Sequence, residues 1–192
     1  WACQLAGIVI TPVNWRVTPE ELDHALSDSG AKALFHDGSV AEAVAGSQIA
    51  PSLPTVPLDG AGGLAEMLDG SAADAIPQAR ADDISLMLYT SGTTSKPKGV
   101  PRRHRAERAG AVAHVAQNLY RHGERTLGVM PLYHTMGVRS LLSSALIGGG
   151  FVCLPRFDVP GALAAIERHG VTNLYLVPTL YHDIVHHDDF TP

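Results

Sequence analysis

The sequence predicts a layered α/β domain with a largely parallel sheet. Short apolar runs typical of buried strands alternate along the chain with longer segments of helical periodicity. The connections between them are short, which favours strand–helix units around a parallel sheet. With 192 residues, 45% of them hydrophobic and 17% charged, the chain has the composition of a globular protein that buries a core of its own.

The first part of the chain, 1–80, is expected to begin with an apolar run and a helix. Thr18-Pro19-Glu20-Glu21 offers a capping hydroxyl, a proline at the first helical position and early acidic residues, so a helix should start there and end near Gly30. Residues 49–57 contain three prolines and cannot form a central strand. The other elements expected here are a strand over 31–35, a weak helix over 40–45 and one short helix over 64–68, inside a surface excursion at 46–77.

The second part, 81–192, carries the clearest alternation. A buried strand over 84–89 leads into a glycine- and hydroxyl-rich loop over 90–100, and a helix follows from 104 to 120. Further strands are expected over 126–130, 151–154 and 172–177, and further helices over 137–146, 161–169 and 179–185.

The loop behind the strand at 84–89 is the most informative segment. Gly92 and Gly99 permit backbone dihedrals that turn amide N–H groups toward an anion, and neighbouring hydroxyls add donors. Pro97 keeps the two flanking lysines out of a helix and follows Lys96 directly, which excludes the P-loop of nucleoside triphosphatases. The alternative is a flexible polar connection. The candidate phosphate loop comprises Thr90, Ser91, Gly92, Thr93, Thr94, Ser95, Lys96, Pro97 and Lys98.

This loop resembles the phosphate-binding signature of the adenylate-forming (AMP-binding) enzymes, which include acyl- and aryl-CoA synthetases, peptide-synthetase adenylation domains and firefly luciferase. Ser95 stands where that family usually has glycine. Other family segments follow in order: 7–22, Ser29-Gly30-Ala31-Lys32-Ala33-Leu34-Phe35, Met130-Pro131-Leu132-Tyr133-His134 and Val177-Pro178-Thr179-Leu180-Tyr181. The resemblance covers nearly all 192 residues, and these residues correspond to less than half of such an enzyme. The chain, which begins at Trp1, is therefore expected to be the N-terminal part of the large domain, without the C-terminal domain.

The resemblance implies an acid–thiol ligase that uses ATP, Mg²⁺ and coenzyme A. A carboxylate attacks the α-phosphorus of ATP to give an acyl-adenylate and pyrophosphate, and the thiol of coenzyme A then takes the acyl group. The phosphate loop would hold the β- and γ-phosphates. His134 would be the catalytic residue beside the reacting carboxylate, and His134, Thr135, Met136 and Tyr175 would line the acyl pocket. The 192 residues alone are expected to be inactive.

The substrate class rests on the finest part of the resemblance. Met130-Pro131-Leu132-Tyr133-His134 and Pro155-Arg156-Phe157-Asp158 are most similar to benzoate and 4-chlorobenzoate CoA ligases, so an aromatic carboxylate is favoured. Tyr175 could stack on the ring of an aromatic substrate, or it could be an ordinary aromatic residue packed in the core. A peptide-synthetase adenylation domain and a non-catalytic phosphate- or nucleotide-binding module remain the alternative functions.

Charge and cysteine content narrow the partners and the compartment. The net charge of −5 argues against nucleic acid, yet six of the 14 Lys and Arg residues lie between Lys96 and Arg108, which suits a small anion.

Cys3 and Cys153 cannot make a disulfide framework, so a reducing, cytoplasmic location is expected. The longest apolar stretch, 141–154, is too short for a membrane span. His182 and His186 have the spacing of zinc ligands but lack a third, so no metal site is expected; a homodimer stays open.

Overall fold

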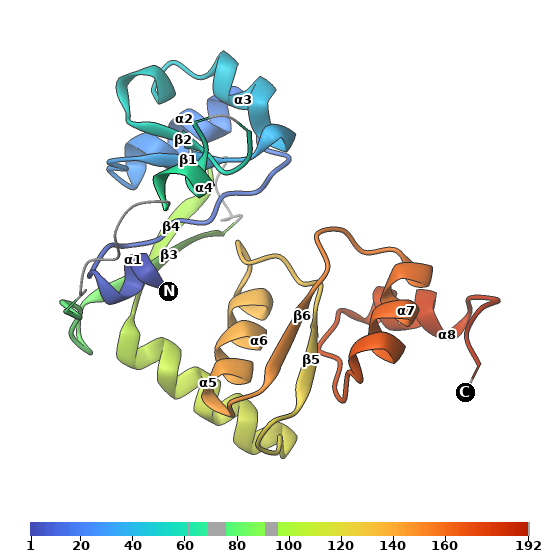
Figure 1. Cartoon of the computed structure of the whole chain (residues 1–192). Coiled ribbons are helices and arrows are strands. Elements are labelled where there is room, and N and C mark those ends of the chain that lie inside the picture. The colour runs from blue at the N-terminus through green and yellow to red at the C-terminus, as the bar shows by residue number, and fades with distance from the viewer. Residues whose placement is uncertain (61, 69–75, 91–95, 192) are drawn as a thin grey trace. The chain divides into compact units, whose positions relative to one another are not determined.

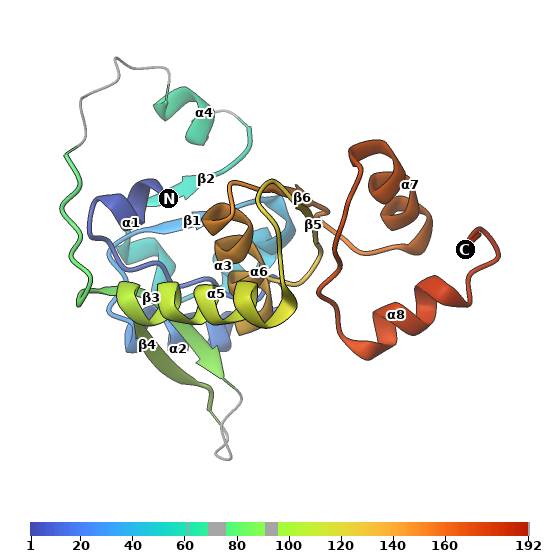
Figure 2. The ribbon, with the colours of Figure 1, turned by 90° about the horizontal axis from the view of Figure 1, so that it is seen from below.

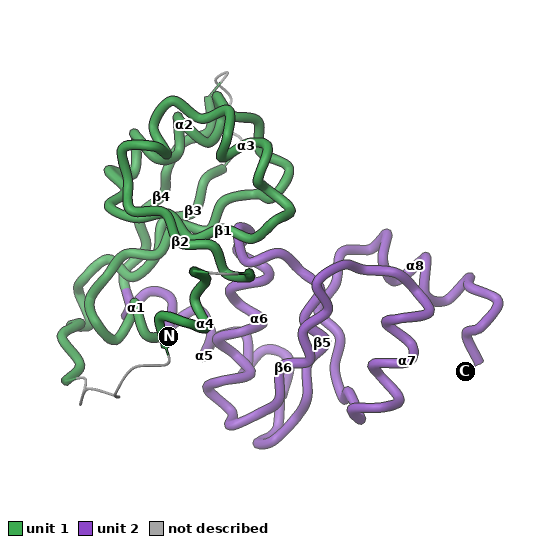
Figure 3. Tube along the Cα trace, turned by 45° about the horizontal axis from the view of Figure 1, so that its top comes forward, with its two compact units in different colours: residues 1–103 green, residues 104–192 purple. Residues whose placement is uncertain are grey.

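The computed structural model describes residues 1–60, 62–68, 76–90 and 96–191, and the chain forms two compact units, 1–103 and 104–192 (Figures 1 and 3). The elements of the first unit are α1 (Ala2–Leu5), α2 (Pro19–Asp28), β1 (Leu34–His36), the 3₁₀ helix η1 (Gly38–Val40), α3 (Ala41–Gly46), the 3₁₀ helix η2 (Ala50–Ser52), β2 (Thr55–Pro57), α4 (Leu64–Met67), β3 (Ile84–Thr90) and β4 (Lys98–Arg103). Those of the second are α5 (His104–Asn118), β5 (Arg125–Gly128), α6 (Thr135–Leu146), β6 (Gly150–Cys153), α7 (Val159–His169) and α8 (Pro178–Val185).

Helix α2 organises the core of the first unit. Its start is the expected one: the Thr18 hydroxyl accepts from the Glu21 N–H, and the Glu21 carboxylate accepts from the Thr18 N–H. The buried face of α2 contributes Leu22 and Leu26 to a cluster with Ala43 and Ala50. Burial of this apolar face accounts for most of the helix's stability, since ten residues are marginal in isolation.

The strands of the first unit differ from expectation in two places. Thr55–Pro57 pairs in parallel with β1, so the excursion at 46–77 contains a strand as well as a helix. Pro57 stands at the end of this strand, in a two-stranded sheet, where a missing N–H is tolerated. Lys98–Arg103 is also a strand and pairs antiparallel with β3 from Thr90↔Lys98 to Ile84↔Arg103, whereas a loop had been expected as far as residue 100.

The second unit is built around the parallel pair β5–β6. Figures 1 and 2 show α6 and α7 on opposite sides of this pair, which gives three layers. On one side Ala162 and Ala165 of α7 pack against Leu127, and all three are buried. The segment 172–177, expected as a third strand, forms only a single bridge, Thr126↔Asn173, in the part of the chain that the structure describes. The α/β prediction with parallel strands is confirmed.

Among the described residues, five helices end in the same hydrogen-bond pattern, but one does so with an unsuitable residue. After α1, α2, α6 and α7 the left-handed position is a glycine: Gly7, Gly30, Gly148 and Gly170. After α5 it is Leu119, with a φ of +54°; its N–H donates to Ala116 O and the next N–H donates to Val115 O. A left-handed leucine costs about 1–2 kcal/mol.

We expect Leu119→Gly to raise the free energy of unfolding by about 1 kcal/mol, because it relieves this strain. Leu119 is 82% exposed, so little buried apolar area is lost. Urea unfolding of the 192-residue chain measures the change. Gly170→Leu is the matched control and should destabilise by a similar amount; a Leu119→Gly variant less stable than the parent would contradict the assignment of strain.

Within the described ranges, no helix has the length and apolar character needed to cross a membrane.

Candidate functional site

The candidate phosphate loop lies between two paired strands of the first unit. Thr90 ends β3 and Lys98 begins β4, and the two face each other across the ladder. Thr90, Lys96 and Lys98 are exposed, and Pro97 is half-buried. Ser91, Gly92, Thr93, Thr94 and Ser95 lie outside the described residues. The described ends therefore bring one hydroxyl and two ammonium groups to the same end of the hairpin, where they are free to meet an anion in solution.

Gly99 has a different role from the expected one. Its φ is not positive, so it does not supply the unusual backbone dihedrals predicted for it. It lies opposite Tyr89 in β4, and a Cβ there would come within 3.2 Å of Tyr89 Cζ, 3.1 Å of Asp28 Oδ2 and 2.8 Å of Met87 Sδ. Glycine suits this position because the side chains of Met87, Asp28 and Tyr89 occupy the space where a Cβ would lie.

Helix α2 contacts β3 and the residue that precedes β4, next to the candidate phosphate loop. The Tyr89 hydroxyl donates to Asp28 Oδ2 at 2.8 Å and lies 3.3 Å from Ala25 O. His24 Nε2 lies 2.8 Å from Pro97 O; because a carbonyl only accepts, Nε2 carries the proton. Burial and the Asp28 carboxylate raise the pKa of Tyr89 to about 12, so its hydroxyl remains a donor at neutral pH.

Three of the four predicted acyl-site residues, His134, Thr135 and Met136, lie at the start of α6 in the second unit. The chain leaves β5, turns at Pro131, whose carbonyl accepts from His134 N–H at 3.0 Å, and enters the helix at Thr135. His134 occupies the N-cap position, yet its side chain makes no capping hydrogen bond to the described helix. Its ring is exposed and packs beside Tyr133, with centroids 4.6 Å apart. An exposed imidazole at a helix start is suited to contact an anionic group.

The other predicted pocket residues are separated into two positions. Thr135 is exposed and Met136 is half-buried in the first turn of α6, next to His134. Tyr175 follows the bridge at Asn173 and is half-buried, with its ring 4.4 Å from that of His114 on α5. The structure thus places His134, Thr135 and Met136 together, and places Tyr175 against His114.

His114 is a buried titratable residue that the sequence did not reveal. It is 8% exposed, and its Nδ1 accepts from Asn118 Nδ2 at 3.3 Å, so the proton of the neutral ring lies on Nε2. Nε2 is buried and has no hydrogen-bond partner among the described residues. Burial, and then the charge of Arg139, lower the pKa of His114. Only its spacing from Glu107 and Ala111 on one helical face could have indicated burial.

We expect His114 to make the chain less stable as the pH falls. With its pKa lowered from 6.5, the folded protein binds fewer protons than the unfolded chain just below that pH. Stability from this group is complete above pH 6.5, declines as the pH falls through it, and levels off below the folded-state pKa. Urea unfolding at several pH values should show a smaller decline for His114→Gln than for the parent, and equal declines would contradict the prediction.

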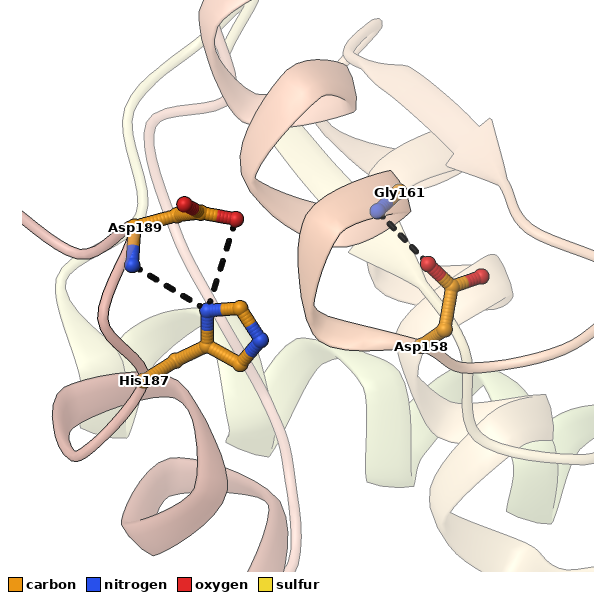
Figure 4. Close-up of polar contacts among 4 residues, drawn as sticks. All are labelled: Asp158, Gly161, His187 and Asp189. Atoms are coloured by element: carbon orange, nitrogen blue, oxygen red, sulfur yellow. Dashed lines mark hydrogen bonds and ion pairs between the residues drawn. The ribbon is translucent and has the colours of Figure 1, made fainter.

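His187 and Asp158 have local partners (Figure 4). Asp158 caps α7 by accepting from Gly161 N–H at 2.7 Å, which gives the last residue of the Pro155–Asp158 motif a structural role. His187 Nδ1 accepts from Asp189 N–H at 3.2 Å. His182 and His186 stack with ring centroids 4.1 Å apart, an arrangement unlike two ligands on one ion. Among the described residues no three His, Cys, Asp or Glu form a metal-binding group.

Two of the solved structures that share this fold illustrate a match over nearly the whole chain. The inhibitor-bound N-terminal domain of FACL13 from Mycobacterium tuberculosis has a TM-score of 0.88 and 28% identity, covering 98% of this chain and 48% of that one. The o-succinylbenzoate CoA synthetase of Bacillus subtilis, in complex with the acyl-adenylate intermediate OSB-AMP, has a TM-score of 0.82 and 28% identity, covering 100% and 48%. The fold is that of the N-terminal region of adenylate-forming enzymes.

The family follows from the sequence comparisons. The model of the AMP-binding enzyme family matches residues 1–191, and the chain belongs to that family. Feruloyl-CoA synthase of Amycolatopsis sp is 38% identical over 188 residues, 97% of this chain and 37% of the relative. Long-chain-fatty-acid–CoA ligase FadD13 of Mycobacterium tuberculosis is 32% identical over 177 residues, 91% and 35%. The chain thus spans little more than a third of the length of these acyl-CoA ligases.

Proposed function

We propose that these residues are the N-terminal part of a longer ATP-dependent acyl-CoA ligase, an acid–thiol ligase that forms AMP. A carboxylate oxygen bonds to the α-phosphorus of ATP and pyrophosphate leaves. The thiol sulfur of coenzyme A then bonds to the acyl carbon, AMP leaves, and the thiol proton passes to solvent. The chain supplies the phosphate-binding and acyl-binding parts, and the adenine-binding segment and C-terminal domain belong to the rest of the ligase.

The observation that carries this proposal is the facing pair Thr90 and Lys98 at the end of the β3–β4 hairpin, with Lys96 beside it. In a member of the AMP-binding enzyme family, a hydroxyl and two ammonium groups at one place fit the β- and γ-phosphates of ATP. Ser91 to Ser95 would add donors from the connecting residues. Mg²⁺, when bound to those phosphates, neutralises charge on the pyrophosphate leaving group.

On the acyl side, the exposed His134 would contact the reacting carboxylate, with Thr135, Met136 and Tyr175 as the wall of the acyl pocket. We favour an aromatic carboxylic acid of the benzoate type because Tyr175 offers a half-buried ring for stacking. Feruloyl-CoA synthase among the similar proteins supports an aromatic acid, whereas the long-chain-fatty-acid–CoA ligase supports an aliphatic one.

The remaining partners follow from the same reaction. ATP, coenzyme A and a small acid are the proposed ligands, with neither nucleic acid nor membrane among them. The free thiols of Cys3 and Cys153 support a cytoplasmic location, and a homodimer is part of the proposal.

Carboxylate-dependent ATP–pyrophosphate exchange by the full-length ligase tests the function, with benzoates, fatty acids and amino acids as substrates. We expect exchange with benzoates, none from the 192 residues alone, and a loss of at least about tenfold for Lys98→Ala. Arg103→Ala, which removes a cation from the other end of β4, is the matched control and should retain exchange. Exchange with amino acids alone would instead assign a peptide-synthetase domain, and ATP binding without exchange would assign a binding module.

A further inference from the structure

The last two turns of α2 face the hairpin that carries the candidate phosphate loop, and the proposed function does not use them. His24 and Asp28 are four residues apart, so they project from the same side of the helix. His24 contacts the residue before β4, and Asp28 contacts β3. Neighbouring Asp23 turns the other way and accepts from the Ser47 hydroxyl and from the N–H groups of Gln48 and Ile49.

The two contacts lie directly at the ends of the phosphate loop. Tyr89, whose hydroxyl donates to Asp28 at 2.8 Å, precedes Thr90. Pro97, whose carbonyl accepts from His24 at 2.8 Å, stands between Lys96 and Lys98. Each hydrogen bond therefore fixes a residue that is adjacent in sequence to a group proposed to contact phosphate.

Side-chain packing reinforces these hydrogen bonds. The rings of His24 and Tyr89 meet edge to face with centroids 6.0 Å apart. Gly99 leaves room for the side chains of Met87, Asp28 and Tyr89, which come within 2.8–3.2 Å of where a Cβ would lie. In a hairpin alone the end that carries the connecting loop would be free to move, whereas these contacts join β3 and the residue before β4 to a helix with a buried face.

We propose that His24 and Asp28 are positioning residues for ATP, which hold Thr90, Lys96 and Lys98 in the arrangement that binds the β- and γ-phosphates. This inference rests on the proposed function. Holding the groups before ATP arrives lowers the conformational cost of binding. The contribution should therefore appear in affinity for the triphosphate and be absent from affinity for AMP, which lacks those phosphates.

The test uses the full-length ligase and compares the Kd values of ATP and AMP by calorimetry. His24→Ala and Tyr89→Phe each remove one of the hydrogen bonds, and we expect each to raise the Kd of ATP about tenfold. The Kd of AMP and the KM of the carboxylic acid should stay within about twofold of the parent. His24→Gln, whose amide nitrogen can replace Nε2 as a donor, should restore ATP affinity.

Asp23→Ala is the matched control, because it removes hydrogen bonds from the same helix that do not reach the hairpin. It should lower the melting temperature and leave the Kd of ATP unchanged. The inference would be overturned if His24→Ala raised the Kd values of ATP and AMP equally, or if a folded variant kept the parental Kd of ATP. In either case, ATP–pyrophosphate exchange by the parent would leave the proposed function intact. A parent without exchange would overturn both.

Discussion

Replacing Gly137 with alanine is expected to destabilise the second unit by about 3 kcal/mol, although alanine favours helices by about 1 kcal/mol over glycine. Gly137 is the third residue of α6 and is buried. A Cβ there would lie closer than 3.0 Å to the carbonyl oxygens of Met130 and Pro131, which are backbone atoms that cannot rotate away. The turn that ends at His134 must move to admit the methyl group.

Urea unfolding of the 192-residue chain measures the stability change, and ATP–pyrophosphate exchange by the full-length ligase measures the effect on the site. Since a displacement of about 1 Å can cost a hundredfold in rate, we expect exchange to fall by about that factor. Ala145→Gly, at an exposed position of the same helix, should cost only about 1 kcal/mol and leave exchange unchanged. A Gly137→Ala variant as stable as the parent would contradict the steric argument.

Gly128→Ala should have the second largest effect, about 2–3 kcal/mol of unfolding free energy. Gly128 is the buried last residue of β5, and the Phe151 ring of β6 lies over it. A Cβ at this position would be closer than 3.0 Å to three carbons of that ring. The ring must leave its rotamer or the two strands must separate, and either change strains the pair that precedes the His134 turn.

A double-mutant cycle separates this clash from a general weakness of the strand. Phe151→Leu removes the ring, so Gly128→Ala should cost at least about 1 kcal/mol less in that background than in the parent. Denaturant unfolding of the four proteins gives the coupling energy. Additive effects of the two substitutions would show that the ring does not determine the need for glycine.

Elements with local signals could be predicted from the sequence. The Thr18–Glu21 capping box lies within four consecutive residues, and for that reason the start of α2 was predicted correctly. The strand at Lys98–Arg103 was missed because Pro101 and three basic residues hide any strand pattern, and the strand exists through its pairing with β3. The run at 172–177 has the composition of a strand, but it contributes only the bridge at Asn173, whose amide oxygen accepts from the Thr126 hydroxyl.

The residues of the candidate site also fall into two groups: those that are neighbours in sequence, which could be predicted, and those that packing brings together, which could not. The hydroxyls and lysines of the candidate phosphate loop all lie within residues 90–98, and His134, Thr135 and Met136 are consecutive, so their sequence order alone grouped them. The His24–Pro97 contact joins residues 73 positions apart, and Tyr89–Asp28 joins residues 61 apart. No local pattern signals such pairs, because they arise from the packing of α2 against the hairpin. The same holds for the contact between His114, on α5, and Tyr175, in the segment between α7 and α8.

In the proposed reaction the carboxylate attacks the α-phosphorus of ATP, and oxygen transfer tests this step most directly. The full-length ligase is supplied with ATP, coenzyme A and benzoate labelled with ¹⁸O in its carboxylate, and the nucleotide product is analysed by mass spectrometry. Because the thiol displaces AMP at the acyl carbon, the bridging oxygen remains on phosphorus. We predict one ¹⁸O atom in each AMP formed. Formation of ADP with the label in inorganic phosphate would contradict the account, since it would place the attack on the γ-phosphorus.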